Sequence, residues 1–281
     1  PEDPFKLNEL AKRNNVTAII DCGVAPGLSN LLVGTIDNYL DRIDNLLIYV
    51  GGLPKIRVWP YEYKAVFSPA DVIEEYTRPA RYIENGILIN RPALSDSEYL
   101  QFPDVGTLEA FNSDGLRTLI DTIAADNMKE KTLRYPGHIE KMMMLRESGF
   151  FNKEKIEING SKISPLEFTS KILFPNWKLN EEDRDVTIMR IIIEGLKKNQ
   201  KIRYVFDLYD QYDESTKTHS MARTTGYTGT AAIRMLASGY YNNTGIIPPE
   251  FIGENKKCVD FILNDLRMKN VTVKETIERI E

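Results

Sequence analysis

The stretch Asp21-Cys22-Gly23-Val24-Ala25-Pro26-Gly27-Leu28-Ser29-Asn30 decides how the rest of this sequence is interpreted. The apolar, β-branched residues 16–20 before it predict a buried strand, and residues 28–39 predict a helix. Two glycines and a proline between them indicate a sharp turn with a close backbone approach. In an open α/β sheet such a loop lies at the carboxyl edge, where ligands bind. Its shape alone leaves two alternatives open, a loop that faces a ligand and a tight turn that faces none.

The composition is that of a globular chain that is long enough for two domains or one large one. It has 281 residues, of which 42% are hydrophobic and 27% are charged. The net charge of −5 is spread along the chain, which argues against nucleic acid or an anionic membrane as the main partner. No apolar run approaches the roughly 20 residues that span a bilayer, and no signal-peptide pattern opens the sequence.

Cysteine and histidine are scarce. Cys22 and Cys258 are far apart, and His138 and His219 complete the set of these two residue types. This pattern predicts neither a disulfide framework nor a metal site, and a reduced, cytoplasmic setting is expected.

Short strands and helices alternate through the first two thirds of the chain. Strands are predicted at 45–50, 63–67, 106–111 and 131–135, and Asn-Gly pairs predict hairpins at 80–91 and 156–163. Helices are predicted at 5–14, 69–76, 116–123, 139–148 and 165–174. Ser68 with Asp71, and Ser164 with Glu167, have the spacing of a capping box.

The last third predicts a long antiparallel strand pair, 185–194 with 201–210, and helices that end near Gly239, at 256–268 and at 273–280. The expected fold class is α/β and α+β. Residues 1–40 would end a Rossmann-type unit, and 41–253 would form a mixed, largely antiparallel sheet domain with helices packed on it. Long exposed strands make a homodimer the expected assembly.

Six segments occur in the order and spacing of one known family, namely 22–27, 51–54, 63–68, 106–118, 132–138 and 220–227. The chain resembles the saccharopine dehydrogenase family of NAD(P)-dependent oxidoreductases, especially the branch that includes lysine 6-dehydrogenase. The resemblance covers nearly the whole chain. It implies a Rossmann domain whose first part, about a hundred residues, would precede this sequence, because no G-x-G-x-x-G is present. Helices in 254–281 would pack back on that domain.

The resemblance also implies a reaction. Hydride would pass between the nicotinamide of NAD or NADP and the carbon of a C–N bond in a small amino-acid substrate, saccharopine-like or lysine. The loop Gly23, Val24, Ala25, Pro26 and Gly27 would then lie beside the nicotinamide. A carboxynorspermidine-type dehydrogenase and a non-catalytic dimerisation module are the alternatives.

Three positions depart from the family pattern. Fungal saccharopine reductases that resemble this chain carry an aspartate at the place of Ala25, a cysteine at Val50 and an arginine at Asp71. An anion at position 71 suits an ammonium group better than a carboxylate. The change therefore argues against saccharopine itself as the substrate, and Ala25 argues against the carboxynorspermidine alternative.

Several polar side chains near strand and helix ends are candidates for the site. Asp71 either caps its helix or binds a substrate amine. Asn112 either forms a turn with Asp114 or binds substrate, and Asp114 is also a catalytic candidate. His138 is either a general acid or base or the start of a helix.

A further candidate is an anion site at Arg223, Thr224 and Thr225. These residues precede a predicted helix start, where a guanidinium and backbone N–H groups could hold a substrate carboxylate. The alternative is an arginine paired with a structural acid.

Overall fold

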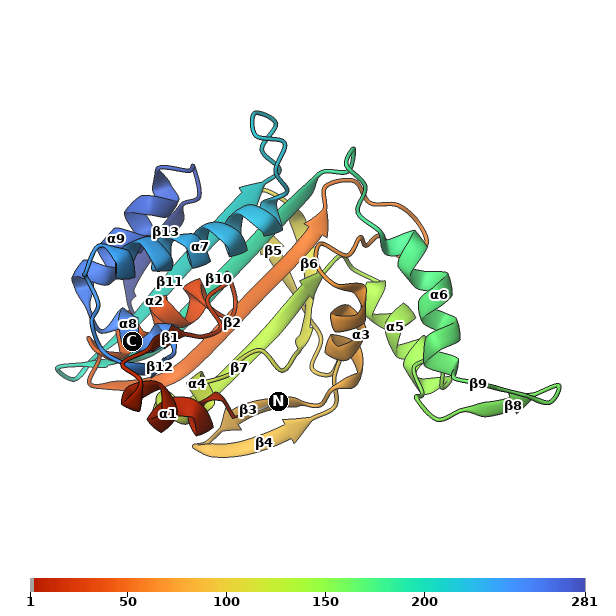
Figure 1. The fold of residues 1–281 in the computed structure, drawn as a ribbon, viewed down its shortest axis with the longest axis horizontal. Helices are drawn as coiled ribbons and strands as arrows, with labels where there is room; N and C mark the ends of the chain where they lie inside the picture. Colours follow the sequence, from red (N-terminus) through yellow and green to blue (C-terminus); the bar gives the residue numbers. More distant parts are fainter. Residues whose placement is uncertain (1–2, 281) are drawn as a thin grey trace.

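The computed structural model describes residues 3–280, so Pro1, Glu2 and Glu281 lie outside it. Within this range nine strands form one mixed sheet in the order β13-β11-β10-β2-β7-β3-β4, and β6 pairs with both β7 and β5 (Figure 1). Their bounds are β2 Arg42–Pro54, β3 Ala80–Glu84, β4 Ile87–Arg91, β5 Glu98–Phe102, β6 Gly106–Asn112, β7 Ala125–Arg134, β10 Asp185–Lys197, β11 Gln200–Gln211 and β13 Val273–Arg279.

The long strands β2, β10 and β11 form the middle of this sheet. Ile188, Ile191 and Ile193 of β10 are fully or almost fully buried, as expected for β-branched residues that pack on a pleated surface. β2 and β7 run parallel, with Val50 opposite Thr132, and the other described pairs of the sheet are antiparallel. The predicted class, a mixed and largely antiparallel sheet with helices, is confirmed.

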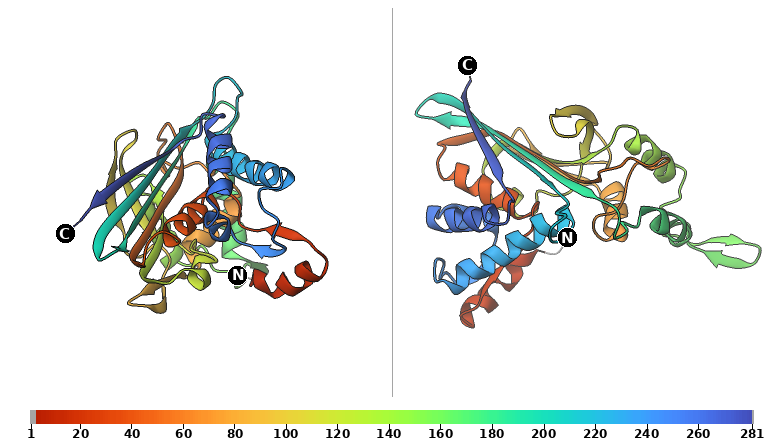
Figure 2. Two further views of the ribbon diagram at one scale, coloured as in Figure 1. Left: turned by 90° about the vertical axis from the view of Figure 1, so that its left-hand side faces the viewer. Right: turned by 90° about the horizontal axis from the view of Figure 1, so that it is seen from above.

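One face of the sheet is covered by helices (Figure 2). They are α2 Leu28–Asp37, α7 Ser220–Ala237, α8 Pro249–Gly253 and α9 Lys256–Arg267. Their apolar sides form the largest core cluster together with the middle strands. At Gly34 of α2 a Cβ would overlap the backbone of Glu250, so α2 and α8 touch backbone to backbone.

The N-terminal segment packs against residues more than 200 positions later. The helical turn η1 (Pro4–Leu7) and α1 (Asn8–Arg13) precede β1 (Thr17–Ile19), which pairs in parallel with β12 (Gly245–Ile247). The predicted strand and the predicted helices on either side of it are confirmed. The domain boundaries at 40 and 253 stay a prediction.

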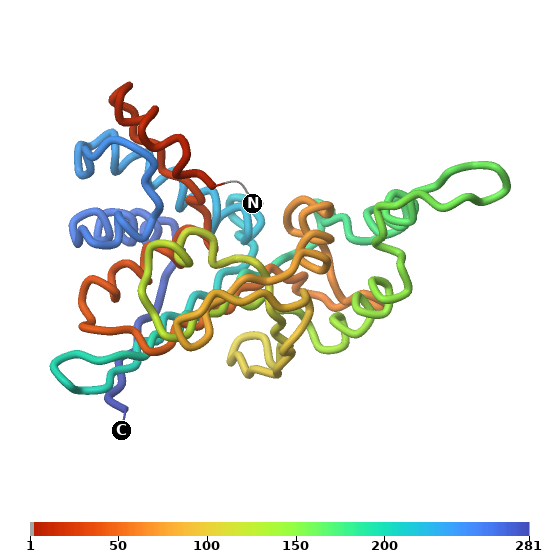
Figure 3. The backbone as a smooth tube through the Cα atoms, turned by 90° about the horizontal axis from the view of Figure 1, so that it is seen from below, coloured from red at the N-terminus to blue at the C-terminus, as the bar shows by residue number. Residues whose placement is uncertain are grey.

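A separate layer of helices lies beyond one end of the sheet, on the right in Figure 1. It contains α3 (Pro69–Thr77), α5 (His138–Glu147) and α6 (Pro165–Trp177), which enclose a separate apolar cluster. The hairpin of β8 (Ile156–Ile158) and β9 (Ser161–Ile163) projects away from this layer (Figure 3). Both Asn-Gly hairpins are confirmed, because Asn85 and Asn159 adopt positive φ as such turns require.

Three predictions about secondary structure are wrong, and strand β5 was missed. The expected helix at 273–280 is strand β13, which covers the edge of β11 by pairing Val273 to Arg279 with Leu208 to Ile202. The expected strand at 63–67 is irregular and has a single bridge, from Ala65 to Lys178. Strand β5 was not predicted, and the helix expected at 116–123 is the single turn α4 (Leu119–Thr122).

The edge on which the homodimer expectation rested is therefore paired within the chain. An open strand edge leaves N–H and C=O groups without partners, and β13 supplies them for β11. The homodimer stays a prediction. No helix in residues 3–280 is long and apolar enough to cross a membrane.

Candidate functional site

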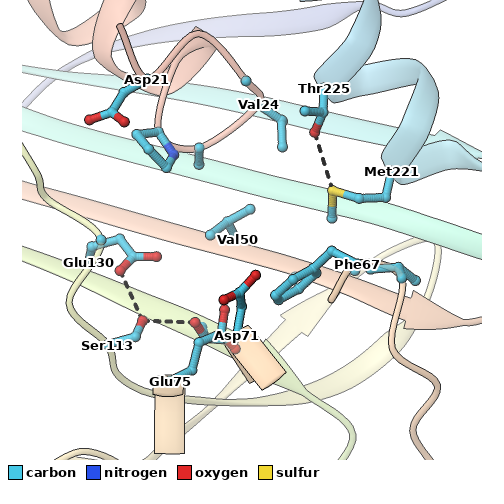
Figure 4. Close-up of a pocket in the computed structure, with 18 of the residues that line it drawn as sticks. Asp21, Val24, Val50, Phe67, Asp71, Glu75, Ser113, Glu130, Met221 and Thr225 are labelled. Atoms are coloured by element: carbon cyan, nitrogen blue, oxygen red, sulfur yellow. Dashed lines mark hydrogen bonds between the residues drawn. The ribbon is translucent and has the colours of Figure 1, made fainter. Parts of the chain in front are cut away.

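A cleft of about 880 Å³ opens between the helix-covered side of the sheet and α3 (Figure 4). We call it the central cleft. It is bounded by the strand-to-helix loop before α2, the end of β2, α3, the loop after β6, β7 and the first turns of α7. Its lining comprises Asp21–Pro26, Val50–Gly52, Val66, Phe67, Asp71, Glu74, Glu75, Arg78, Ser113–Gly115, Arg117, Glu130, Thr132, Arg134, Met221, Ala222, Thr225 and Gly226.

The strand-to-helix loop closes on itself. Gly23 N–H donates to Pro26 O at 3.0 Å, and Leu28 N–H donates to Gly23 O at 2.8 Å. Gly27 has φ 137°, and a Cβ there would overlap Gly23, so only glycine fits. The loop consequently presents Val24, Ala25 and Pro26 to the central cleft.

Of the five predicted cofactor residues, four therefore line the central cleft, and Gly27 shapes the loop behind them. The loop thus borders a cavity, and its place beside a nicotinamide stays a prediction. The alternative of a tight turn also describes its backbone, which turns sharply and is closed by the two hydrogen bonds of Gly23.

Acidic groups outnumber basic groups in the lining. Of the residues described there, six carry carboxyl groups and three carry guanidinium groups, namely Asp21, Asp71, Glu74, Glu75, Asp114 and Glu130 against Arg78, Arg117 and Arg134. Arg81 and Lys153, which lie outside the lining, pair with Asp114 and Glu74, so Asp71 is the carboxylate best placed to attract a cationic ligand.

Two of the arginines are already paired within the wall. Arg117 binds Asp21 in a bidentate ion pair, with 2.9 Å from Nε to Oδ2 and 3.2 Å from Nη2 to Oδ1. Arg134 binds Glu75 with 2.7 Å from Nη2 to Oε2. These two guanidinium groups are thus largely neutralised by protein carboxylates.

The third arginine is the most available cation. Arg78 is 41% exposed, and its ion pairs are long, 3.5 Å to Glu74 and 4.0 Å to Asp114. It could hold a substrate carboxylate, because a weakly paired guanidinium keeps donors free. Sequence reasoning missed Arg78, which lies one turn of α3 beyond Glu74 and follows the last residue of that helix.

Asp114 lines the central cleft, but its carboxylate is occupied. Arg81 donates to it from Nε at 2.8 Å and from Nη2 at 3.3 Å. Asn112 does not line the cleft, since its side-chain amide donates to Ser95 and to Asp96 on the other side of the strand end. Asn112 therefore links the end of β6 to the loop before β5, and Asp114 links the loop after β6 to Arg81 of β3.

Asp71 is exposed at the mouth of the central cleft in the first turn of α3. The predicted capping box is wrong here, because the Ser68 side chain makes no capping hydrogen bond. In the described chain no hydrogen bond or ion pair to Asp71 is found. At the second predicted box, Ser164 Oγ does accept from Glu167 N–H at 3.4 Å.

His138 is fully buried outside the central cleft, at the start of α5. Its Nε2 lies 2.9 Å from Tyr76 Oη and its Nδ1 lies 2.8 Å from Tyr61 O. Burial and the nearby Arg134 charge lower its pKa to about 3. The structure thus separates this imidazole from the cavity and keeps it neutral, and the helix-start alternative describes it.

The predicted anion site at the start of α7 is wrong. The helix begins at Ser220, and Arg223, Thr224 and Thr225 lie inside it. The N-terminus already holds an anion, because Asp185 accepts from Ser220 N–H at 2.7 Å and from Met221 N–H at 3.0 Å.

Arg223 is 4% exposed and belongs to a structural network. It forms ion pairs with Asp210 at 3.2 Å and with Asp213 at 2.7 Å, as the structural alternative predicted. Thr224 Oγ1 donates to Ser220 O within the helix, and Thr225 lines the central cleft beside Met221.

Glu130 is a feature of the site that the sequence did not single out. Its side chain lines the central cleft and is 7% exposed, and Ser113 Oγ donates to its Oε2 at 2.9 Å. Burial raises its pKa to about 8, and the nearby Glu75 and Asp114 carboxylates raise it too, whereas the hydrogen bond from Ser113 lowers it. A carboxyl group with such a pKa can exchange protons near neutral pH.

The described part of the chain shows neither an activated thiol nor a cluster of metal ligands. Burial raises the pKa of the Cys22 thiol to about 11, which disfavours a reactive thiolate. Within residues 3–280 no group of three His, Cys, Asp or Glu side chains is arranged to hold a metal ion.

Fold and site together define a class: a mixed-sheet α/β protein in which a strand-to-helix loop faces an acidic cleft. Residues 23–271 match the Saccharopine dehydrogenase C-terminal domain. The chain belongs to the saccharopine dehydrogenase family.

Individual relatives are distant in sequence. Carboxyaminopropylagmatine dehydrogenase of Synechocystis sp. is 22% identical over 248 residues, which cover 85% of this chain and 61% of that protein. The saccharopine dehydrogenase [NADP(+), L-glutamate-forming] of Pyricularia oryzae is 24% identical over 210 residues, 70% of this chain and 47% of that protein. The chain thus spans about half to three fifths of the length of these two relatives.

Solved structures share the fold. Apo saccharopine dehydrogenase (L-Glu forming) from Saccharomyces cerevisiae matches with a TM-score of 0.78 and 17% identity, over 97% of this chain and 76% of that one. Homospermidine synthase from Legionella pneumophila, determined in complex with NAD, matches with a TM-score of 0.58 and 13% identity, over 98% of this chain and 68% of that one.

Proposed function

We propose that this chain supplies the substrate cleft of a nicotinamide-dependent oxidoreductase that acts on the C–N bond of an amino-acid substrate. The observation that carries the proposal is the central cleft itself. It joins an apolar loop at one end to an excess of carboxyl groups at the other, within a family whose members include dehydrogenases. The active protein is proposed to combine this chain with a dinucleotide-binding domain.

The charge of the cleft supports an amine substrate. Asp71 lies exposed at its mouth and has no ion pair with any residue in 3–280, and a carboxylate in that position suits an ammonium or guanidinium group. Arg78, on the same helix side, provides a cation for a substrate carboxylate. A substrate that carries both charges, such as an amino acid with a second amine, fits this arrangement.

The opposite end of the cleft fits a nicotinamide ring. Val24, Ala25 and Pro26 form one apolar lip, and Val50 and Met221 lie across from it (Figure 4). The N–H groups of Gly23 and Leu28 are used within the loop, and the apolar side chains of Val24, Ala25 and Pro26 offer contact area to a ring. When bound, the nicotinamide would accept or deliver hydride at C4. These residues would hold the ring of either NAD or NADP.

Two kinds of substrate are candidates. A lysine-type substrate is favoured by Asp71, which stands where the resemblance implies an arginine in saccharopine reductases. A carboxyalkyl derivative of a guanidino or diamine compound is the second candidate, favoured by the excess of carboxyl groups over guanidinium groups in the lining. The two differ in the group that Asp71 would contact, an ammonium or a guanidinium.

An amine panel tests the proposal. A full-length protein that contains this chain would be assayed by NAD(P)H absorbance with lysine, saccharopine, agmatine and putrescine, the last two alone and with pyruvate or aspartate semialdehyde as carbonyl partner. Turnover of one of them supports the proposal, and no turnover with any of them contradicts it. The matched variants are Asp71→Asn, expected to raise KM for the amine, and the exposed Asp260→Asn of α9, expected to leave it unchanged.

A further inference from the structure

Glu130 is a buried carboxyl group in the wall of the central cleft. It lies in β7 and lines the cleft together with Thr132 and Arg134 of the same strand (Figure 4). Its Oε2 accepts a hydrogen bond from Ser113 Oγ at 2.9 Å, and Ser113 Oγ lies 2.8 Å from Thr132 Oγ1. Among the described residues no cation comes within ion-pair distance of it. A carboxylate buried in this way is costly, so the protonated form is favoured in the free protein.

The loop after β6 packs against the carboxyl group of Glu130. A Cβ at position 115 would overlap Glu130 Oε2, so the Gly115 backbone lies directly against the carboxyl group. The neighbouring Ser113 provides the hydroxyl that binds the same oxygen. Glu130 is therefore held in one place at the cavity wall, which a proton-transfer group requires.

The charged groups that face Glu130 come from two other elements. Glu75 projects from α3 and is paired with Arg134, and Asp114 projects from the loop after β6 and is paired with Arg81. Burial and these two carboxylates raise the pKa of Glu130 to about 8. The Ser113 hydroxyl and the Gly115 backbone N–H lower it. The group can therefore be protonated or ionised under ordinary assay conditions.

We propose that Glu130 is the catalytic acid–base that exchanges a proton with the substrate nitrogen. The inference rests on the proposed function, because it assumes a C–N bond that is oxidised or reduced in the central cleft. Other titratable groups are less suited. Asp114 is held by Arg81, and His138 lies outside the cleft.

The proton step balances in both directions. When an imine is reduced, the O–H bond of Glu130 breaks and an N–H bond forms on the imine nitrogen. The positive charge then lies on the nitrogen and the negative charge on the carboxylate. In the oxidative direction the N–H bond of the iminium breaks, its electron pair remains on nitrogen as the imine lone pair, and the O–H bond of Glu130 forms again. No oxidant or reductant takes part in this exchange.

The first test needs no turnover. The protein would be labelled with [5-¹³C]glutamate, and the carboxyl resonance that is missing in Glu130→Gln would be followed against pH. The expected midpoint lies near pH 8 in the wild type. The control Glu109→Gln replaces another buried glutamate, which accepts from Gly137 N–H at 3.1 Å away from the central cleft. A midpoint near 4.5, the ordinary value for glutamate, would overturn the inference.

The second test uses steady-state kinetics of the full-length protein with the substrate identified by the amine panel. Glu130→Gln is expected to lower kcat by roughly 10²- to 10⁴-fold with little change in KM, and to remove the limb of the pH profile near pH 8. Glu109→Gln should keep the wild-type kcat. Equal activity and an unchanged profile in Glu130→Gln would overturn this inference and leave the proposed function standing. A wild type inactive with every amine would overturn both.

A third variant leaves the carboxyl group in place. Ser113→Ala removes a hydrogen bond that lowers the pKa of Glu130. The limb is therefore expected to move to higher pH, while kcat at its plateau changes much less than in Glu130→Gln. A limb that stays at the wild-type pH would contradict an assignment to Glu130. This variant also decides the matter if Glu130→Gln does not fold.

Discussion

Arg134 on β7 and Glu75 on α3 form an ion pair, with 2.7 Å between Nη2 and Oε2, in the wall of the central cleft. The guanidinium lies 4.5 Å from the Tyr63 ring centroid, and its Nε donates to Tyr76 Oη at 3.1 Å. One arginine thus connects strand β7 of the sheet to the layer of α3, α5 and α6. Its Nε and one Nη2 donor are used by Tyr76 and Glu75 and are therefore not available to a ligand.

Removing this guanidinium should destabilise the fold. Arg134→Met would leave Glu75 without its cation and Tyr76 Oη without that donor, so we expect a loss of about 3–5 kcal/mol in the free energy of unfolding. Urea denaturation measures it. The matched control is Arg42→Met at the exposed pair with Asp44, which should change the midpoint little. Equal midpoints for both variants would contradict a structural role of Arg134.

Arg223 should also matter for stability and not for substrate affinity. Arg223→Met breaks the buried pair with Asp210 and the partly exposed pair with Asp213, and a loss of about 3 kcal/mol is expected from the buried pair. Asp210→Asn in addition should restore part of it, because the remaining carboxylate is no longer unpaired. Denaturation gives the stabilities, and kinetics at a temperature where the variant is folded gives KM. A raised KM with unchanged stability would return Arg223 to the substrate site.

Local chemistry made much of the fold predictable. Asn85-Gly86 and Asn159-Gly160 define hairpins because their positive φ angles are properties of the turn residues themselves. The loop before α2 was predicted for a similar reason, since only Gly27 fits its backbone. Such features depend on a few consecutive residues and can be inferred without knowing what lies nearby.

The errors arose where a distant residue decides the outcome. Residues 273–280 form a strand because β11 offers an edge, which no local pattern in that segment reveals. The start of α7 was placed too late because its cap, Asp185, lies 35 residues before Ser220. Glu130 was missed because the strand around it is rich in charged residues, and its burial depends on the loop at Gly115. The one available indication was three polar residues, 130, 132 and 134, on one face of a strand.

Acid should destabilise the protein partly through His138. Its folded pKa of about 3 lies below the ordinary value of 6.5, so the unfolded chain binds a proton that the folded chain excludes. The stabilisation from this group is present above pH 6.5 and is lost as the pH falls from 6.5 towards 3, by up to about 1.4 kcal/mol per pH unit.

His138→Gln should therefore lower stability at pH 7 and lose less than the wild type on going to pH 4.5. Urea denaturation at several pH values measures the difference between the two proteins, in which the contribution of other titrating groups cancels. The control Met142→Leu changes a buried neutral residue of the same helix and should follow the wild-type slope. Parallel curves for His138→Gln and the wild type would show that the imidazole is not held neutral.

Two helical glycines should respond to alanine in opposite directions. At Gly34 in α2 a Cβ would overlap the backbone of Glu250 in α8, and backbone cannot move aside as a flexible side chain can. Gly34→Ala should therefore destabilise the protein by about 1–3 kcal/mol, the range of overpacked cores. At Gly226 in α7 a Cβ meets nothing within 4 Å, so alanine should gain its helix propensity of roughly 0.5–1 kcal/mol. Thermal and urea unfolding of the two variants give the comparison. Because both changes add the same methyl group inside a helix, a loss of similar size at both positions would contradict the close contact of α2 with α8 as the cause.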